Sequence, residues 1–140
     1  MKQTLSIPRT LANRLLSLAQ NTPDTEICGL ISQSKSPHNK PQYRVYPIHN
    51  IATKPHCVFE MQPRQQIQAF KSIREADETL FAVFHSHPHS AALPSEKDLN
   101  DAAYTDALNL IISLGTQGVL DMRGYFYRKQ GIEAVELVIS

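Results

Sequence analysis

The chain has 140 residues and a mass of 15.7 kDa, the size of one domain with its own hydrophobic core. Its 14 Lys and Arg residues and 13 Asp and Glu residues leave a formal net charge of +1. That balance argues against a protein that coats nucleic acid and against an acidic solvating tail. With 41% hydrophobic and 19% charged residues, the composition excludes a largely disordered chain. We therefore expect a single domain over residues 1–140.

The sequence carries no feature of export or membrane insertion. The segment MKQTLSIPRT has no apolar stretch of signal-peptide length, and no run approaches the roughly 18 apolar residues of a membrane span. Cys28 and Cys57 lie far apart and outside any C-x-x-C pair, so we expect reduced thiols, although the sequence is compatible with one disulfide. These features predict a cytoplasmic protein.

An amphipathic helix and three short strands are predicted in the first part of the chain. Leu11, Leu15 and Leu18 recur at helical spacing, which predicts a helix over about residues 8–20. The first strand is apolar enough to be buried on both faces of a sheet. The three predicted strands are Glu26–Ser32, Gln42–Ile48 and Cys57–Met61. The polar segment 32–41 reads as a surface turn.

A second helix is predicted over Pro63–Asp77, with Ile67, Phe70 and Ile73 on one face. A wholly apolar central strand, Leu80–Phe84, follows it. The remaining predicted elements are a helix over 96–107 and strands at Leu108–Leu114, Val119–Arg128 and Val135–Ile139. Helices interspersed with strands indicate an α/β sandwich, and consecutive strands without an intervening helix require that part of the sheet is antiparallel.

The segment Phe84–Asp98, FHSHPHSAALPSEKD, holds the chemically informative residues. His85 and His87 are two residues apart at the end of a predicted strand, so alternation places both imidazoles on one face. Ser95-Glu96-Lys97-Asp98 has the S-x-x-D form of a capping box, which puts Asp98 in the first turn of a helix. Two imidazoles and a carboxylate are a ligand set that leaves the fourth position of a catalytic zinc site open for water.

Glu26 and Ser95 are the candidate catalytic side chains. Glu26 begins an apolar segment, where burying a carboxylate is costly unless it has a partner or a function. It can take a proton from a zinc-activated water and pass it to a leaving amine, while the Ser95 hydroxyl can stabilise an oxyanion. Taken singly, Ser95 and Asp98 are better explained as a helix cap and Glu26 as a turn carboxylate. The fixed offsets among all these residues favour the metal site.

The pattern consists of Glu26, the segment H-S-H-P that starts at His85, Ser95 with seven residues between it and His87, and Asp98 after two more. It resembles the JAMM motif of the MPN-plus metallopeptidases. The flanking segments E-x-C-G-L, S-A-A-x-P-S and I-I-S-L agree with it. The similarity extends from Leu11 to Tyr127 and is closest to the short prokaryotic members of the family.

The resemblance implies a fold, a site and an activity. The implied fold is a three-layer α/β/α sandwich with a mixed sheet, like that of cytidine deaminases. His85, His87 and Asp98 would bind zinc, Glu26 would be the general base and acid, and Ser95 would help to stabilise the tetrahedral intermediate. The implied reaction is hydrolysis of the bond after the C-terminal Gly-Gly of a ubiquitin-like β-grasp protein such as a sulfur carrier. No nucleic-acid or membrane partner is expected, and a homodimer is left open.

Other classes of function fit the sequence less well. A non-catalytic MPN scaffold or interaction module is the main alternative. Such relatives usually lack one or more of the ligands, whereas Glu26, His85, His87 and Asp98 are all present here. A zinc deaminase needs H-x-E and P-C-x-x-C, which the sequence does not contain. A DNA-directed role lacks a basic excess. Iron or cobalt can replace zinc at a His-His-Asp site.

Several side chains outside this pattern are expected to be structural. Phe59, Met61 and the aromatic residues 125–127 are expected to pack rather than to line a groove for an extended C-terminal tail. Cys28 is expected to be a small buried hydrophobe and not a nucleophile. His89, an extra imidazole in the loop of the motif, is expected to be solvated, as are His38, His49 and His56.

Overall fold

The computed structural model describes residues 3–35, 40–100, 106–115 and 121–140. In these residues the elements are, in chain order, β1 (Thr4–Ile7), α1 (Arg9–Asn21), β2 (Cys28–Gln33), β3 (Tyr43–Ile48), α2 (Pro63–Glu75), β4 (Thr79–His87), α3 (Glu96–Asn100), β5 (Leu108–Ser113), β6 (Asp121–Arg128) and β7 (Gly131–Ile139). Among the described helices, none combines the length and the apolar character that crossing a membrane requires.

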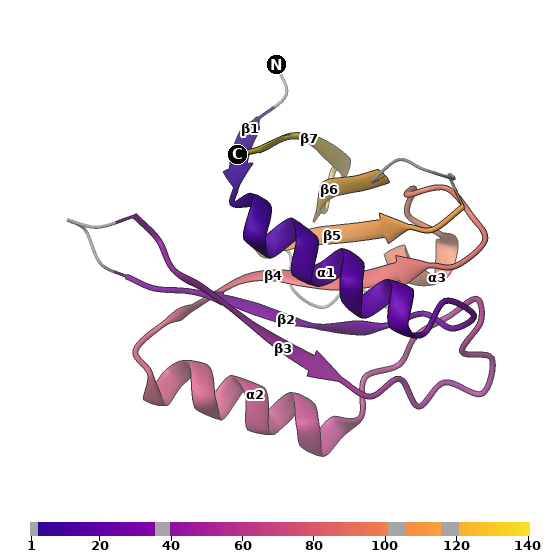
Figure 1. The fold of residues 1–140 in the computed structure, drawn as a ribbon, viewed down its shortest axis with the longest axis horizontal. Coiled ribbons are helices and arrows are strands. Elements are labelled where there is room, and N and C mark those ends of the chain that lie inside the picture. Colours follow the sequence, from indigo (N-terminus) through magenta and orange to yellow (C-terminus); the bar gives the residue numbers. More distant parts are fainter. Residues whose placement is uncertain (1–2, 36–39, 101–105, 116–120) are drawn as a thin grey trace.

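The strands form one mixed sheet in the order β1-β7-β6-β5-β4-β2-β3 (Figure 1). The pairs β1–β7 and β4–β5 are parallel, and the other neighbouring pairs are antiparallel. The predicted mixture of parallel and antiparallel pairing is therefore confirmed. β4 lies inside the sheet, with hydrogen-bonded neighbours on both edges, so its backbone is held on both sides.

Alternation along β4 divides its side chains between the two faces of the sheet. Ala82 and Phe84 belong to one apolar cluster with Leu15 of α1. Val83 belongs to a second cluster with Ala69 of α2. His85 comes two residues after Val83 and shares its face. Helices on both faces give three layers, with α1 across one face and α2 on the other (Figure 1), as predicted.

The first helix is confirmed, and one assignment in the second is wrong. In α1, Leu11 and Leu15 are buried as predicted, and Pro8 is the N-cap. In α2, Ile73 is buried, but Ile67 is 68% exposed. The buried side of α2 is centred on Ala69 and Ile73, and at 3.6 residues per turn Ile67 lies about 160° around the helix from Ala69.

Two predicted elements are corrected, and one strand was not predicted. Residues 57–61 make only an isolated bridge between Met61 and Asn50, because side-chain contacts of Asn50 take the place of a strand partner there. The described part of α3 is Glu96–Asn100, and residues 106–107 are turn and bend, so the helix predicted to 107 is too long. β1 is only four residues long and was missed. Residues 36–39, 101–105 and 119–120 of the predicted elements lie outside the described residues.

Candidate active site

The two histidines of the motif lie inside β4 and not after it, because the strand continues to His87. His85 pairs with Cys28 of β2 on one side and with Ile111 of β5 on the other, and His87 pairs with Ser113. Both side chains are buried. The imidazoles are thus fixed on one face of the sheet by a strand that is hydrogen-bonded on both edges.

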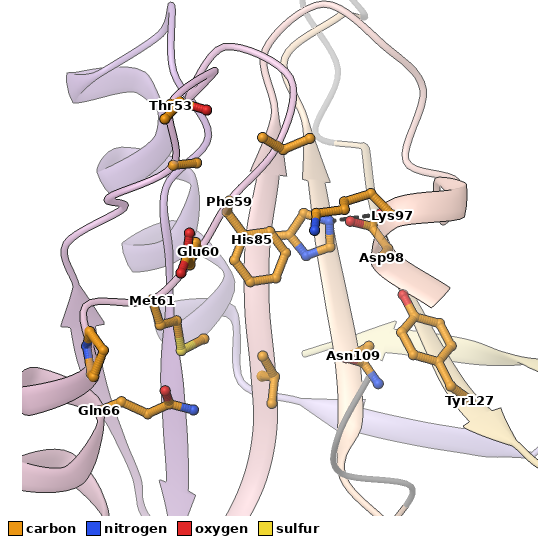
Figure 2. Close-up of a pocket in the computed structure, with 14 residues that line it drawn as sticks. Thr53, Phe59, Glu60, Met61, Gln66, His85, Lys97, Asp98, Asn109 and Tyr127 are labelled. Atoms are coloured by element: carbon orange, nitrogen blue, oxygen red, sulfur yellow. Dashed lines mark hydrogen bonds and ion pairs between the residues drawn. The ribbon is translucent and has the colours of Figure 1, made fainter. Parts of the chain in front are cut away.

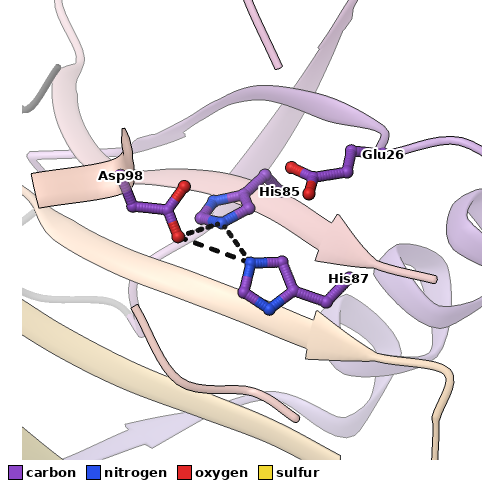
Figure 3. Close-up of side chains that lie close together, drawn as sticks. All are labelled: Glu26, His85, His87 and Asp98. Carbon is purple, nitrogen blue, oxygen red and sulfur yellow. Dashed lines mark hydrogen bonds and ion pairs between the residues drawn. The ribbon is translucent and has the colours of Figure 1, made fainter. Parts of the chain in front are cut away.

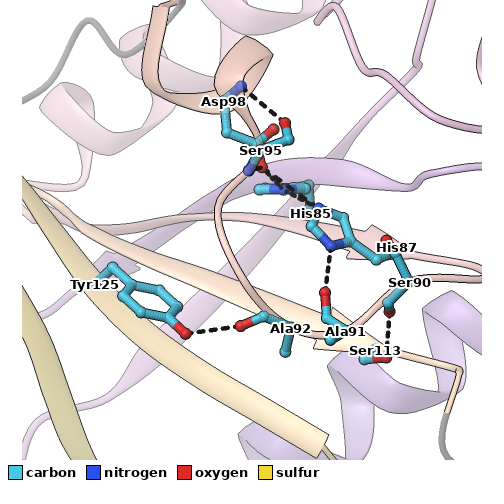
Figure 4. Close-up of polar contacts among 9 residues, drawn as sticks. All are labelled: His85, His87, Ser90, Ala91, Ala92, Ser95, Asp98, Ser113 and Tyr125. Atoms are coloured by element: carbon cyan, nitrogen blue, oxygen red, sulfur yellow. Dashed lines mark hydrogen bonds and ion pairs between the residues drawn. The ribbon is translucent and has the colours of Figure 1, made fainter. Parts of the chain in front are cut away.

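The capping box brings Asp98 to these histidines (Figure 4). The Ser95 N–H donates to Asp98 Oδ2 over 2.9 Å, and the Asp98 N–H donates to Ser95 Oγ over 3.1 Å. The same Oδ2 lies 3.1 Å from His85 Nε2 and 3.4 Å from His87 Nε2. The Asp98 carboxylate therefore caps the helix and also faces both imidazoles, so a role as helix cap and a role as metal ligand are compatible.

The three facing atoms have the spacing of metal ligands. His85 Nε2 and His87 Nε2 are 3.1 Å apart, which closes a triangle with Asp98 Oδ2 (Figure 3). Around a tetrahedral zinc with bonds of about 2.0–2.1 Å, two ligand atoms are separated by about 3.3 Å. A triangle of two imidazole nitrogens and a carboxylate oxygen at this spacing fits a divalent cation, and it leaves a fourth position open.

Contacts behind His87 orient its ring. His87 Nδ1 donates to the carbonyl oxygen of Ala91 over 2.8 Å, which leaves the Nε2 lone pair of the neutral ring free to face the triangle. The neighbouring carbonyl of Ala92 accepts a 2.8 Å bond from the Tyr125 hydroxyl, so the same loop is tied to β6 (Figure 4). These contacts form the outer shell that a metal-binding histidine requires.

The protonation states of Asp98 and His85 also suit a cation. Burial raises the pKa of Asp98, but hydrogen bonds with His85 and His87 outweigh it and hold the pKa of this carboxyl well below its usual range. Burial lowers the pKa of His85, which keeps that ring neutral. Burial also lowers the pKa of His87, but its bonds to Asp98 and Ala91 and the nearby carboxylates give a net increase.

Glu26 lies just before β2 and completes the cluster (Figure 3). Its carboxylate and the ligand atoms of the other three residues all lie within 4.8 Å of one another. The side chain is only 4% exposed, and its Oε1 has no hydrogen-bond partner among the described residues. Burial raises the pKa of Glu26 to about 7; the charge of His87 opposes this shift and that of Asp98 adds to it. A carboxyl with this pKa can both accept and return a proton near neutral pH.

Asn50 holds Glu26 in place, and it was not identified from the sequence. Its amide nitrogen donates to the carbonyl oxygens of Glu26 and Val58, both over 3.0 Å. Its Oδ1 accepts 3.0 Å bonds from the N–H groups of Ala52 and Glu60. The bond to Ala52, two residues on, is an Asx turn, which is the local signal that could have drawn attention to this asparagine.

A cavity of about 650 Å³ opens beside the cluster (Figure 2). His85 and Asp98 line it, together with Phe59, Met61 and Tyr127. The Phe59 ring stacks on the His85 ring with centroids 4.5 Å apart. Phe59, Met61 and Tyr127 pack as expected, and they also line this cavity; whether an extended tail lies in it stays a prediction.

The remaining expectations for single residues are confirmed where the structure describes them. Phe126 packs in the core, and Tyr125 is buried. Cys28 is buried and Cys57 exposed, and both are free thiols; burial raises the pKa of Cys28 to about 12, which is unsuited to a nucleophile. His49, His56 and His89 are exposed, and His38 lies outside the described residues. Ser95 is half-buried, and its shown role is the helix cap.

Comparison with known proteins finds several that are similar in sequence to this chain. A desampylase of Haloferax volcanii is 26% identical over 95 residues, which are 68% of this chain and 67% of the relative. A probable TtuB-protein conjugate cleaving protease of Thermus thermophilus is 32% identical over 54% of this chain, which spans about half, 49%, of that relative. A CysO-cysteine peptidase of Mycobacterium bovis is 24% identical over 86% of this chain and 81% of the relative.

A similar solved structure and a matching family profile agree with these sequence similarities. The solution structure of protein DSY2949 from Desulfitobacterium hafniense has a TM-score of 0.82 and 28% identity, covering 96% of this chain and 92% of that one. The sequence profile of the prokaryotic homologs of the JAB domain matches residues 8–125, which include the whole Glu26, His85, His87 and Asp98 cluster. The chain therefore belongs to the family of prokaryotic homologs of the JAB domain, in agreement with its JAMM motif.

Proposed function

We propose that this chain is a cytoplasmic zinc metallopeptidase or isopeptidase, folded as one domain over residues 1–140. Its substrate is a ubiquitin-like β-grasp protein of the sulfur-carrier type, and it hydrolyses the bond after that protein's C-terminal Gly-Gly. The observation that carries the proposal is the buried convergence of Glu26, His85, His87 and Asp98 within 4.8 Å. The family match and the names of the relatives, a conjugate-cleaving protease and a peptidase among them, support this reaction class and this kind of substrate.

His85, His87 and Asp98 are the proposed zinc ligands. Zinc at this position supplies a Lewis acid and lowers the pKa of water towards about 7. The buried rings of His85 and His87 present nitrogen lone pairs, and Asp98 supplies the negative charge that partly balances a divalent cation. The cap that holds Asp98 sets the carboxylate in place before the metal binds.

Glu26 is the proposed general base and then the general acid. Its unpaired Oε1 lies next to the ligand triangle, where it can take a proton from the attacking water and give it to the departing amine. Ser95 is proposed to help to stabilise the oxyanion. Its Oγ already accepts the N–H of Asp98, and its own proton is free to be donated to a substrate oxygen.

The test is intact-mass analysis of a panel of β-grasp proteins that are extended beyond Gly-Gly by a peptide, a single amino acid or a lysine-linked protein. Each is incubated with the zinc-loaded chain, with its Glu26→Gln variant, and with Glu75→Gln as a matched change of an exposed carboxylate that does not line the cavity. We expect cleavage after Gly-Gly with the wild type and with Glu75→Gln and none with Glu26→Gln, at one zinc per chain in all three. Cleavage at the wild-type rate by Glu26→Gln would overturn the assignment of the base.

The alternative, a non-catalytic scaffold of the same fold, makes a different prediction. A scaffold binds a β-grasp protein without cleaving it, and Glu26→Gln then leaves both binding and product unchanged. Binding of the panel without cleavage at full zinc occupancy would favour the scaffold over the peptidase. The complete ligand set and the unpaired Glu26 carboxylate, which a scaffold does not need, favour the enzyme.

A further inference from the structure

Tyr127 places at the cavity a buried hydroxyl that has no hydrogen-bond partner in the described part of the chain. The residue lies on β6, and its side chain lines the cavity with His85 and Asp98 (Figure 2). It is only 7% exposed, and its hydroxyl oxygen has no hydrogen-bond partner among the described residues. Figure 2 shows this hydroxyl directed to the side of the cavity where Asp98 lies.

The neighbouring tyrosine of the same strand shows what a satisfied phenol looks like here. Tyr125 is buried to a similar extent, and its hydroxyl donates to Ala92 over 2.8 Å. A buried hydroxyl without such a bond carries a desolvation cost, which a ligand can relieve by pairing with it. Burial raises the pKa of Tyr127, and the charge of Asp98 adds to this shift, so the phenol keeps its proton and is available as a donor.

We propose that Tyr127 is a substrate-binding residue, whose hydroxyl donates a hydrogen bond to a main-chain carbonyl oxygen of the polypeptide segment lying in the cavity. The inference rests on the proposed peptidase function, because it takes the occupant of the cavity to be a polypeptide. It adds a contact outside the Glu26, His85, His87, Asp98 and Ser95 set.

The geometry of a bound polypeptide supports a carbonyl as the acceptor. The carbonyl of the bond to be cleaved has to approach the His85, His87 and Asp98 triangle, and Asp98 also lines the cavity beside Tyr127. An extended chain advances about 3.3–3.6 Å per residue, so further carbonyl groups lie within the cavity next to that bond. Gln66, Lys97 and Asn109 also line the cavity, but among its described lining residues the Tyr127 hydroxyl is the buried donor that has no hydrogen-bond partner, so a substrate carbonyl can use it.

The test compares Tyr127→Phe with Tyr46→Phe. Both changes remove one buried, unpaired phenol hydroxyl and keep the ring, but Tyr46 does not line this cavity. For each variant we would measure zinc content, melting temperature and kcat/KM on the extended β-grasp substrate. In the Glu26→Gln background, calorimetric titration with the same substrate gives its Kd without cleavage.

We expect Tyr127→Phe to lower kcat/KM and to weaken binding by about tenfold, the effect of one lost hydrogen bond to a carbonyl that is left unpaired. Zinc content should stay at the wild-type value, the melting temperature should not fall, and Tyr46→Phe should match the wild type within about twofold.

Three results would overturn the inference. Wild-type cleavage and binding by Tyr127→Phe would overturn it alone and leave the proposed function standing. Loss of zinc or a lower melting temperature in Tyr127→Phe would assign the hydroxyl to the structure of the site instead. A wild-type chain that neither binds nor cleaves any β-grasp substrate would overturn the proposed function and the inference with it.

Discussion

The face of the sheet under α1 and the opposite face, which carries the site, are packed differently. Under α1, Leu15, Phe84 and Leu110 belong to one extended cluster of fully buried apolar side chains. On the other face the apolar cluster is smaller, and the cavity adjoins it. Within the described part of the chain, the buried side-chain atoms that lack a partner are Glu26 Oε1, Tyr46 Oη and Tyr127 Oη, and their residues belong to this second face.

The difference shows how one sheet can serve stability and chemistry at the same time. Buried polar atoms without partners reduce stability, so a face that keeps them depends on the packing of the other face. Buried and pre-positioned polar groups are also what catalysis requires. The two faces should therefore respond in opposite ways to mutation, and the following changes test that expectation.

Asp98→Ala should have the largest effect, which is loss of zinc and of detectable activity. The change removes the only carboxylate of the proposed ligand triangle and leaves two histidines. Metal content by mass spectrometry and the cleavage assay measure it. Glu96→Ala is the matched control, because Glu96 is an exposed carboxylate of the same helical turn, and it should leave both readouts unchanged. Zinc retained at one per chain in Asp98→Ala would contradict the assignment.

Phe84→Ala should destabilise the chain by about 3–5 kcal/mol, the usual cost of emptying a phenylalanine site in a well-packed core. Phe84 has 0% exposure and faces the α1 side next to His85. Urea unfolding followed by circular dichroism measures the free energy of unfolding. A loss below about 1 kcal/mol would mean that the α1 face repacks easily, and the comparison of the two faces would fail.

Glu26→Gln should stabilise the metal-free protein at pH 8, by up to about 3 kcal/mol, even though it abolishes turnover. The pKa of Glu26 is raised from 4.5 to about 7 in the folded chain. A raised pKa gives stability that is complete below pH 4.5 and is lost as the pH rises through 7. At about 1.4 kcal/mol per pKa unit, the shift sets the upper limit. Urea unfolding in a chelator between pH 5 and 8 measures the effect, and a loss in wild-type stability no steeper than in Glu26→Gln would contradict it.

Asn50→Ala should lower the free energy of unfolding by about 2 kcal/mol, since it leaves the carbonyls of Glu26 and Val58 without their donor. Because Glu26 is then held less firmly, kcat should fall more than KM changes. Chemical unfolding and steady-state kinetics measure the two effects. Asn50→Asp keeps the acceptor for Ala52 and Glu60 and should retain part of the stability; equal values for the two variants would argue against the role of the amide donor.

Ile67→Ser should have the smallest effect, within about 0.5 kcal/mol, because Ile67 lies on the exposed side of α2. Ile73→Ser on the same helix is the control and should destabilise strongly, since Ile73 is buried. Thermal melting of the pair checks the corrected orientation of α2. Similar losses for both variants would mean that the helix is rotated from the described arrangement.

Local rules were enough to predict much of the fold and part of the site. The leucine spacing located α1, and a wholly apolar run located the centre of β4. Local rules failed where contacts with another segment decide the outcome. The Cys57–Met61 segment has the residues of a strand but pairs with Asn50, and Ile67 was assigned to a buried face because periodicity alone does not orient the stripe. β1 is too short to give a periodic signal and exists through its pairing with β7.

The sequence by itself determined the candidate donor set and the orientation of its local parts. Period-two alternation in a strand puts His85 and His87 on one face, and a capping box turns the Asp98 carboxylate back onto its own helix start; both rules act within a few residues. The tertiary structure decided what surrounds them. Pairing of β2 with β4 and the Asn50 contacts bring Glu26 to the histidines across 59 residues of chain, and β6 brings Tyr127 to the cavity. The positions of Glu26 beside the histidines and of Tyr127 at the cavity depend on sheet order and loop contacts, which no short-range pattern encodes.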